Sequence, residues 1–216
     1  DRRKHMEDKI EYYNLKNIKR VKAFEGSKIT NLKNGKIDGY SYTSNCKGTP
    51  DNKASELAIS MSHIYAINQA YLEGHNSAII MEDDIDFFLA PKWERKFKDI
   101  LNEIPDDCDI LLLAHNGTGK SGMISIKDFS IRISGVCYLI TKKGMEKINK
   151  FIDDKHFTFP ENLSSIVWDD EIVSEMNIYH TGKSLFLLYN FNFSSERQLE
   201  FMFFDNDSYK ILNSYL

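Results

Sequence analysis

The clearest pattern along the chain is a helix-period apolar face over residues 55–74. Apolar side chains recur there at three- and four-residue spacing, with Ser55 as the predicted N-cap and Gly74 as the predicted C′ residue. A continuous apolar run follows at 77–81 and predicts a strand that is buried on both faces. A long helix that leads directly into such a strand is typical of α/β folds.

The same alternation of helix and strand patterns continues to the C-terminal part of the chain. Further strands are predicted at 21–24, 109–114, 130–141 and 184–189; further helices are predicted from Pro91 to residue 101, over 142–152 and over 168–176, and residues 1–20 are compatible with another. The predicted class is therefore α/β, with residues 1–216 forming one domain around a mixed, mainly parallel central sheet flanked by helices.

Residues 26–53 break this alternation. They are rich in Gly, Asn, Lys, Ser and Thr and contain the turn signals Asn34-Gly35 and Asp38-Gly39. We therefore expect a long loop here, and a loop of this length in a compact domain is usually functional or mobile.

Composition narrows the range of partners. The net charge of -4 and the pI near 5.9 do not favour nucleic acid as a partner. The 3 cysteines form no CxxC pair, so neither a disulfide framework nor a cysteine-rich zinc site is expected. No run reaches the ~18 apolar residues of a membrane-spanning helix.

The candidate chemistry lies directly after the strand at 77–81, where Glu82, Asp83, Asp84 and Asp86 follow one another. Like charges this close raise one another's pKa unless a cation neutralises them. Hard oxygen ligands without Cys or His favour Mg²⁺ or Mn²⁺. Ligands of open α/β sheets bind at the carboxyl ends of strands. Position and chemistry together predict a metal site.

The ligand assignment within this cluster follows from strand alternation. Glu82 and Asp84 are expected on one side of an extended backbone and Asp83 on the other. Asp84 is the predicted direct ligand, with Glu82 beside it as a metal or ribose partner. Asp84-Ile85-Asp86 is also a DxD sequence, so Asp86 is a rival ligand. The simpler alternative is a solvated acidic turn.

The sequence around this cluster resembles that of glycosyltransferase family 25, which includes lipopolysaccharide-biosynthesis transferases and procollagen hydroxylysine galactosyltransferases. The similar stretch reads MSHIYAINQAYLEGHNSAIIMEDDIDF, with the family's serine–histidine pair as Ser62-His63 and its "EDD" at residues 82–84. Shorter blocks that resemble the family in the same order lie at 1–3, 20–26, 49–56, 109–113, 135–144 and 167–170. Two glycines of the family pattern are replaced by Ser55 and Ala58.

The resemblance implies a single-domain, GT-A-like (Rossmann-like) fold whose first strand would precede Asp1. It also implies an inverting transferase that moves a hexose, most often galactose, from a UDP-sugar with Mn²⁺ or Mg²⁺ bound at the DXD motif. The acceptor would be a glycan or the hydroxylysine of a collagen-like protein. Such an enzyme would be cytoplasmic in a bacterium or virus and lie in the endoplasmic reticulum lumen as a eukaryotic collagen-modifying enzyme; homo-oligomerisation stays open.

Inverting transfer needs a base that takes the proton of the acceptor hydroxyl. The block Val167-Trp168-Asp169-Asp170 makes Asp169 or Asp170 the candidate base. The alternative is that these acidic residues only charge the first turn of a helix.

The donor and metal sites receive further residues from the resemblance. The donor nucleotide is assigned to Arg2, Arg3, Arg20, His63, Glu82 and Asp83, and the metal to Asp84, Glu82 and Asp86. His180 is added as a distal metal ligand, because GT-A enzymes often use a late histidine, although family 25 has no clear histidine at this place. A solvated terminus is the alternative for Arg2 and Arg3. A hydrogen-bonded core histidine is the alternative for His63.

Two other functions compete with the transferase. Asp84, Asp86 and Asp170 match the chemistry of a two-metal phosphoesterase or nuclease. The second competing function is that of a catalytically inactive binding module with the same fold. A phosphate-loop interpretation of residues 116–121 is rejected, because the position that needs the motif's first glycine is Ala114.

Overall fold

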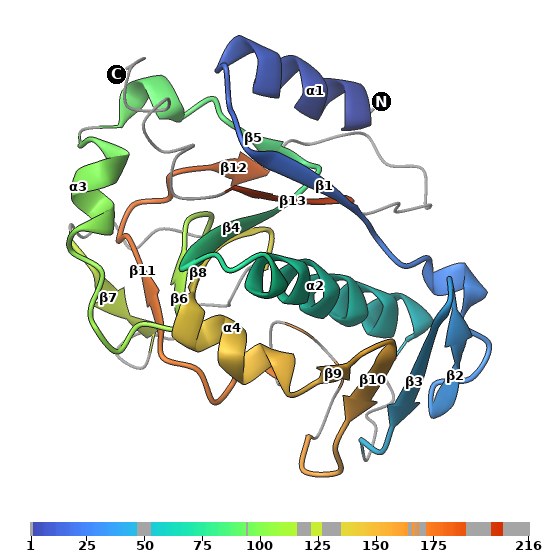
Figure 1. Cartoon of the computed structure of the whole chain (residues 1–216). Helices are drawn as coiled ribbons and strands as arrows, with labels where there is room; N and C mark the ends of the chain where they lie inside the picture. Colours follow the sequence, from blue (N-terminus) through green and yellow to red (C-terminus); the bar gives the residue numbers. More distant parts are fainter. Residues whose placement is uncertain are drawn as a thin grey trace.

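A mixed β-sheet forms the centre of the chain in the computed structural model (Figure 1). The structure describes residues 2–46, 53–93, 95–115, 122–126, 135–163, 166, 168, 172–188 and 200–204, with backbone only for 187–188 and 200–204. In sheet order the strands are β1 (Ile18–Lys22), β13 (Glu200–Phe204), β4 (Ser77–Glu82), β8 (Cys137–Thr141), β6 (Ile110–Leu112), β11 (Ile178–His180) and β7 (Ile124–Ser125).

The strand directions correct the expectation of a mainly parallel sheet. Among the neighbouring strands described, only β11 and β6 pair in parallel, and every other pair in this sheet is antiparallel. The expectation was wrong because a continuous apolar run reports burial on both faces and carries no information on the direction of its neighbours. β4, β6 and β11 still run the same way, since β8 separates β4 from β6. Their carboxyl ends therefore meet at one edge.

Helices cover the two faces of this sheet. Figure 1 shows α2 (Ala54–Leu72) and α4 (Lys142–Asn149) side by side against the strands, and their apolar residues join Ala78 and Ile80 in one core cluster. Ile79 and Met81 point to the opposite cluster, which takes residues from α1 (Arg2–Tyr12) and α3 (Phe97–Leu101). The prediction that the strand at 77–81 is buried on both faces is confirmed.

The predicted long helix is also confirmed, with a shifted start. α2 begins at Ala54 after Lys53 rather than after Ser55, and Gly74 has the left-handed φ of 80° expected of a C′ glycine. The helix predicted from Pro91 is shorter: a 3-10 turn, η2 (Ala90–Lys92), precedes α3. The strand predicted at 184–189 is realised as β12 (Leu187–Leu188), which pairs with β5 (Ile85–Asp86).

The long loop expected at 26–53 is partly wrong. After a 3-10 turn, η1 (Gly26–Lys28), the chain forms a hairpin of β2 (Asn34–Ile37) and β3 (Tyr40–Ser44), and β10 (His156–Phe159) and β9 (Ile152–Asp153) complete a four-stranded sheet. Asp38 and Gly39 link the hairpin with φ values of 47° and 86°, as a type I′ turn requires. Asp-Gly between strand residues is a hairpin signal, which the polar composition obscured. Residues 47–52 lie outside the described part.

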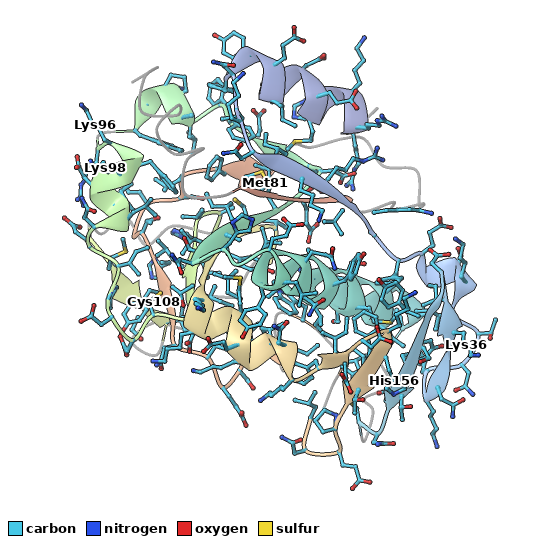
Figure 2. All side chains as sticks on the ribbon, in the orientation of Figure 1. Lys36, Met81, Lys96, Lys98, Cys108 and His156 are labelled. Carbon is cyan, nitrogen blue, oxygen red and sulfur yellow. The ribbon has the colours of Figure 1, made fainter. Side chains whose placement is uncertain are left out.

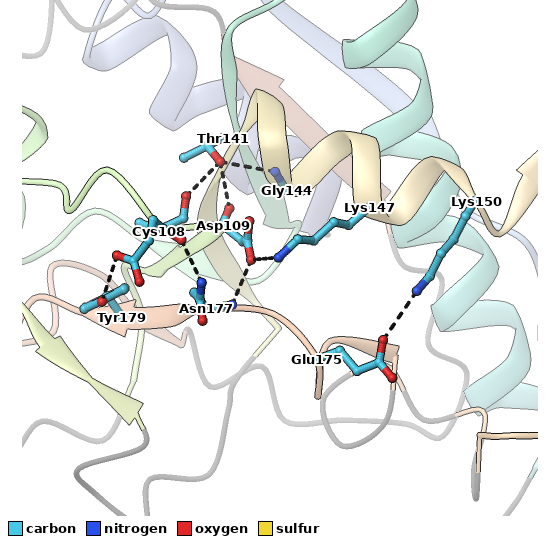
Figure 3. Close-up of polar contacts among 10 residues, drawn as sticks. Cys108, Asp109, Thr141, Gly144, Lys147, Lys150, Glu175, Asn177 and Tyr179 are labelled. Atoms are coloured by element: carbon cyan, nitrogen blue, oxygen red, sulfur yellow. Dashed lines mark hydrogen bonds and ion pairs between the residues drawn. The ribbon is translucent and has the colours of Figure 1, made fainter.

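A buried carboxylate, Asp109, ties the amino edge of the sheet to α4 (Figure 3). Its Oδ2 accepts hydrogen bonds from the backbone N–H of Asn177, at 2.8 Å, and from Lys147 Nζ. Its carbonyl oxygen accepts from the backbone N–H of Thr141 at 3.0 Å. α4 approaches so closely that a Cβ on Gly144 would lie 2.5 Å from that oxygen. One side chain thus fixes the relative position of β6, β11 and α4.

We expect Asp109→Ala to lower the free energy of unfolding by about 2–3 kcal/mol, because it removes the charged acceptor of the part-buried Asn177 N–H. Urea unfolding at pH 7 measures the loss. Lys150→Ala is the matched control, since Lys150 and Glu175 form an exposed pair at 3.6 Å (Figure 3) that contributes at most about 1 kcal/mol. Equal losses in the two variants would contradict the role assigned to Asp109.

No helix among the described residues is long and apolar enough to cross a membrane.

Candidate functional site

The acidic cluster lies where β4 ends. Glu82 is the last residue of β4, Asp83 and Asp84 form the turn that follows, and Asp86 closes the short strand β5. Met81, labelled in Figure 2, is the last buried apolar residue before them. Asp83 and Asp84 are only 3% and 8% exposed. Two carboxylates are therefore held out of water at the edge where β4, β6 and β11 end.

Arg2 of α1 joins these two carboxylates. Its Nη1 donates to Asp83 Oδ1 at 2.9 Å, and its Nη2 donates to Asp84 Oδ2 at 2.8 Å. Strand alternation would have placed Asp83 opposite Asp84. That expectation was wrong, because the extended backbone stops at Glu82 and the turn brings the next two side chains to the same side. Both carboxylates thus converge on one cationic group.

The carboxylate of Asp86 makes contacts that differ from those of Asp83 and Asp84. Its Oδ1 accepts from the backbone N–H of Phe88 at 2.9 Å and lies 3.4 Å from Lys9 Nζ. α1 is fixed above the cluster by the buried side chain of Met6 and by Tyr13, whose hydroxyl donates to the carbonyl oxygen of Phe87 at 3.2 Å. Two cationic side chains of α1, Arg2 and Lys9, therefore offset the negative charge of the acidic cluster. Arg2 contacts Asp83 and Asp84, and Lys9 contacts Asp86.

The protonation of Asp83 reflects this crowding. Burial raises the pKa of Asp83 to about 7; the Arg2 guanidinium opposes the rise, and the neighbouring Asp84 and Glu82 charges add to it. The cluster therefore holds a proton across much of the acid and neutral range. A further cation at the cluster would favour the ionised form of Asp83.

Glu82 turns toward α2, where it meets His63. The Nε2 of His63 lies 3.6 Å from Glu82 Oε1, and its Nδ1 lies 2.9 Å from the Tyr138 hydroxyl. The ring also stacks on Trp168, with centroids 4.6 Å apart. Burial lowers the pKa of His63 to about 3, so the histidine is neutral at pH 7 and its contact with Glu82 is not an ion pair. The structure places it as a core histidine that orients its neighbours.

His180 lies at a distance from the acidic cluster. It ends β11, and the sheet order places β11 three strands from β4, roughly 14 Å at about 4.8 Å per strand. Its Nδ1 accepts from the backbone N–H of Gly182 at 3.0 Å, and burial lowers its pKa. Its ring lies 4.7 Å from that of His115. The structure therefore groups His180 with His115 rather than with Asp84.

Sequence reasoning missed His115, although a signal was present. His115 directly follows the apolar run at 110–114, as Glu82 follows the run at 77–81. The rule that strand ends carry functional groups applies to both positions.

The remaining predicted residues are dispersed. Arg3 pairs with Glu7 across 2.7 Å on the outer face of α1, with both side chains more than half exposed. Arg20 is exposed on β1, which β13 separates from β4. Asp169 and Asp170 lie outside the described residues. The structure therefore joins Arg2, Asp83 and Asp84 directly and joins His63 to Glu82.

Within the described ranges, no group of three or more His, Cys, Asp or Glu residues is arranged to hold a metal ion. Comparisons of the chain with protein-family models, curated proteins and solved structures found no match. Fold and site thus define an α/β chain with a buried carboxylate pair at a strand end, bridged by an arginine. The resemblance to glycosyltransferase family 25 stays a prediction.

The raised pKa of Asp83 gives a pH test. The unfolded chain releases this proton near 3.8 and the folded chain near 7, so the free energy of unfolding falls as the pH rises through this window. We expect Asp83→Asn to remove that fall, on the order of 3 kcal/mol between pH 4 and 7. Urea unfolding at a series of pH values, in a chelating buffer, measures the change of slope.

His63→Gln is the control of opposite sign. The folded chain protonates His63 only near 3 and the unfolded chain near 6.5, so this residue makes stability rise with pH through the window. Removing His63 should remove this rising contribution, so that the free energy of unfolding falls more steeply with pH in the variant than in the wild type. Identical pH slopes in the wild type and both variants would contradict the burial of these two groups.

Proposed function

We propose that the chain is a metal-dependent, inverting glycosyltransferase that takes a hexose from a UDP-sugar, with its divalent cation at Asp83 and Asp84. One observation supports the proposal above the others: Asp83 Oδ1 and Asp84 Oδ2 converge on a single cationic group at the carboxyl edge of β4. In open α/β sheets, ligands bind outside the carboxyl ends of the strands.

The donor set fits Mg²⁺ or Mn²⁺. Both groups are hard carboxylate oxygens, and this turn holds no sulfur or imidazole ligand. Mg²⁺ keeps several waters and takes one or two protein carboxylates plus substrate phosphates. Two carboxylates are therefore sufficient, and a third protein ligand is not required. Asp84 is favoured over Asp86, because the carboxylate of Asp86 is directed to Lys9 and the Phe88 N–H.

Arg2 takes two roles in this proposal. Without a substrate it neutralises Asp83 and Asp84 and keeps them in place. If Asp83 and Asp84 held a cation, the guanidinium of Arg2 would be available to the diphosphate, whose oxygens suit its planar fork. Its side chain is 15% exposed, so it lies at the border between the buried carboxylates and solvent. Lys9 adds a second positive charge on the same helix.

The cation, when bound, stabilises the charge of the leaving diphosphate as a Lewis acid. The chain itself supplies orientation. Glu82 contacts the neutral His63, which Tyr138 and the stacked Trp168 hold in position. Asp169 or Asp170 remains the candidate base, on the resemblance alone. UDP-galactose as the donor, and a glycan or collagen-like hydroxylysine as the acceptor, rest on the same ground.

A second candidate function has its own supporting observation. Arg2 already supplies a positive charge to the carboxylate pair. A binding module that has lost catalysis would need nothing more at this position. The two candidates differ in whether a metal ion can replace the arginine.

Incubation with UDP-galactose and Mn²⁺ tests the enzyme. We expect release of UDP that requires the metal, and we expect Asp84→Asn to reduce the rate about 100-fold or more, because metal stabilisation of a leaving group is worth several kcal/mol. A coupled assay for UDP measures the rate. Asp86→Asn is the control, with an expected loss below about tenfold.

Other outcomes separate the alternatives. Phosphate or oligonucleotide products without UDP would favour the phosphoesterase or nuclease. Nucleotide binding that survives Asp84→Asn, with no turnover in either protein, would favour the inactive module.

The proposed exchange at Arg2 can be measured without turnover. We expect Arg2→Gln to tighten Mn²⁺ binding by about three- to tenfold in the absence of nucleotide, because a competing cation is removed. The same variant should bind UDP more weakly in the presence of Mn²⁺. Isothermal titration calorimetry gives both constants.

Arg3→Gln is the matched control, since Arg3 is exposed and pairs with Glu7. It changes the net charge equally and should leave both constants near the wild-type values. Weaker Mn²⁺ binding by Arg2→Gln would contradict the exchange.

A further inference from the structure

A row of four polar side chains crosses the smaller sheet, whose strands follow the order β2, β3, β10 and β9 (Figure 1). The register pairs Lys36 with Ser41, Ser41 with His156, and His156 with Asp153. Side chains at directly opposed positions lie on the same face of a sheet. Each strand therefore contributes one member to this polar row, and Figure 2 labels two of them, Lys36 and His156.

The polar row lines a groove of about 530 Å³ that is open to solvent. The groove lies where the turns at Asp38-Gly39 and Asp154-Lys155 meet, because β3 and β10 are parallel and both begin at this end of the sheet. Ser41 and His156 are half-buried in its wall. A hydroxyl and an imidazole are thus held on rigid strands and stay accessible to a substrate.

The hydroxyl and the imidazole are in direct contact. Ser41 Oγ lies 2.7 Å from His156 Nδ1. The other acceptor near this hydroxyl is the carbonyl oxygen of Lys155 at 3.5 Å, which already accepts the backbone N–H of Ser41 at 2.8 Å. Hydrogen bonds donated by hydroxyl groups are typically ~2.7–2.8 Å long, against ~2.9–3.0 Å for those donated by N–H groups to oxygen. The distance therefore favours a serine hydroxyl that donates to Nδ1, as a nucleophile does to its base.

Charged residues flank this pair on both sides. Lys36 lies directly opposite Ser41, and Asp153 lies directly opposite His156; the Cβ atoms of such pairs are roughly 5 Å apart. Among the described residues, neither of the two takes part in an ion pair. Asp153 makes no hydrogen bond to the ring of His156, so it acts on the imidazole through its charge alone.

We infer that Ser41 and His156 form an acyl-transfer site that hydrolyses carboxylic esters. Ser41 Oγ attacks the ester carbonyl carbon while its proton passes to His156 Nδ1. The tetrahedral intermediate collapses to an acyl-serine, and the departing alcohol takes the proton from Nδ1. Water then attacks the acyl-serine in the same way, which releases the carboxylic acid and restores both residues.

The flanking charges support both halves of this reaction. The ammonium group of Lys36 stabilises the negative oxygen of the tetrahedral intermediate. The carboxylate of Asp153 favours the imidazolium that forms when His156 takes the serine proton. The inference is independent of glycosyl transfer, because no residue of the acidic cluster at 82–86 lines this groove.

Hydrolysis of 4-nitrophenyl acetate by the whole chain tests the inference. We expect Ser41→Ala to lower the protein-dependent release of 4-nitrophenolate at least about tenfold, since general-base activation of a nucleophile contributes ~10²-fold or more. Thr43→Ala is the matched control: it also removes a hydroxyl from the same face of β3, but Thr43 does not line the groove. This variant should keep the wild-type rate.

Two further measurements separate chemistry from a structural role. A fluorophosphonate probe, which loses fluoride and stops at the phosphonyl-serine, should label Ser41 in the wild-type chain, as located by peptide mass spectrometry. His156→Ala should lower the rate of ester hydrolysis as Ser41→Ala does, and added imidazole should restore part of the rate. Lys36→Gln should lower the rate more than Lys33→Gln, which changes the net charge equally on an exposed residue outside the groove.

Circular dichroism of each variant checks that the chain remains folded. Absence of protein-dependent hydrolysis, an unchanged rate in folded Ser41→Ala, or a probe that labels a residue other than Ser41 would overturn the inference. A His156→Ala rate that imidazole does not raise would overturn the role of His156 as the base.

Discussion

The arrangement around the candidate site depends on the double hydrogen bond from Arg2 to Asp83 and Asp84. Two nearly buried carboxylates in adjacent positions repel each other, and burial penalises their charge further. One guanidinium between them opposes both effects in part, since the pKa of Asp83 still rises to about 7, and it joins α1 to the turn after β4. The same geometry shows that the two carboxylates can share a cation. A structural ion pair and a metal site would therefore both require this turn to bring the two carboxylates together.

The sheet explains why chemistry gathers at one edge. β4, β6 and β11 run in the same direction although β8 intervenes. Their carboxyl ends carry the acidic cluster, His115 and His180. The opposite edge is closed by Asp109 and its bonds to Asn177 and Lys147. One edge is therefore fixed by a buried carboxylate, and the other presents groups that can meet ligands.

The sequence was sufficient for features with a local cause. The sequence was enough to predict the helical period of α2 and the buried apolar run of β4, because side-chain spacing reports which faces are buried. The acidic residues after β4 could be recognised in the same way, from their position after that run. The predictions that were wrong concern features that depend on neighbouring strands or on turn geometry. Strand direction, the hairpin at Asp38-Gly39 and the same-side placement of Asp83 and Asp84 are decided by neighbours or by turn geometry. The pairing of His180 with His115 depends on the order of the strands, which periodicity does not report.

In the proposed function, Asp83 and Asp84 hold an exchangeable cation. Anomalous diffraction from crystals of the chain grown with Mn²⁺ and UDP tests it most directly. We expect a manganese peak about 2.1 Å from a carboxylate oxygen of Asp84, with the Arg2 guanidinium moved from the carboxylates to the diphosphate. Crystals that contain bound UDP, no manganese peak at this turn and Arg2 still joined to both carboxylates would contradict it.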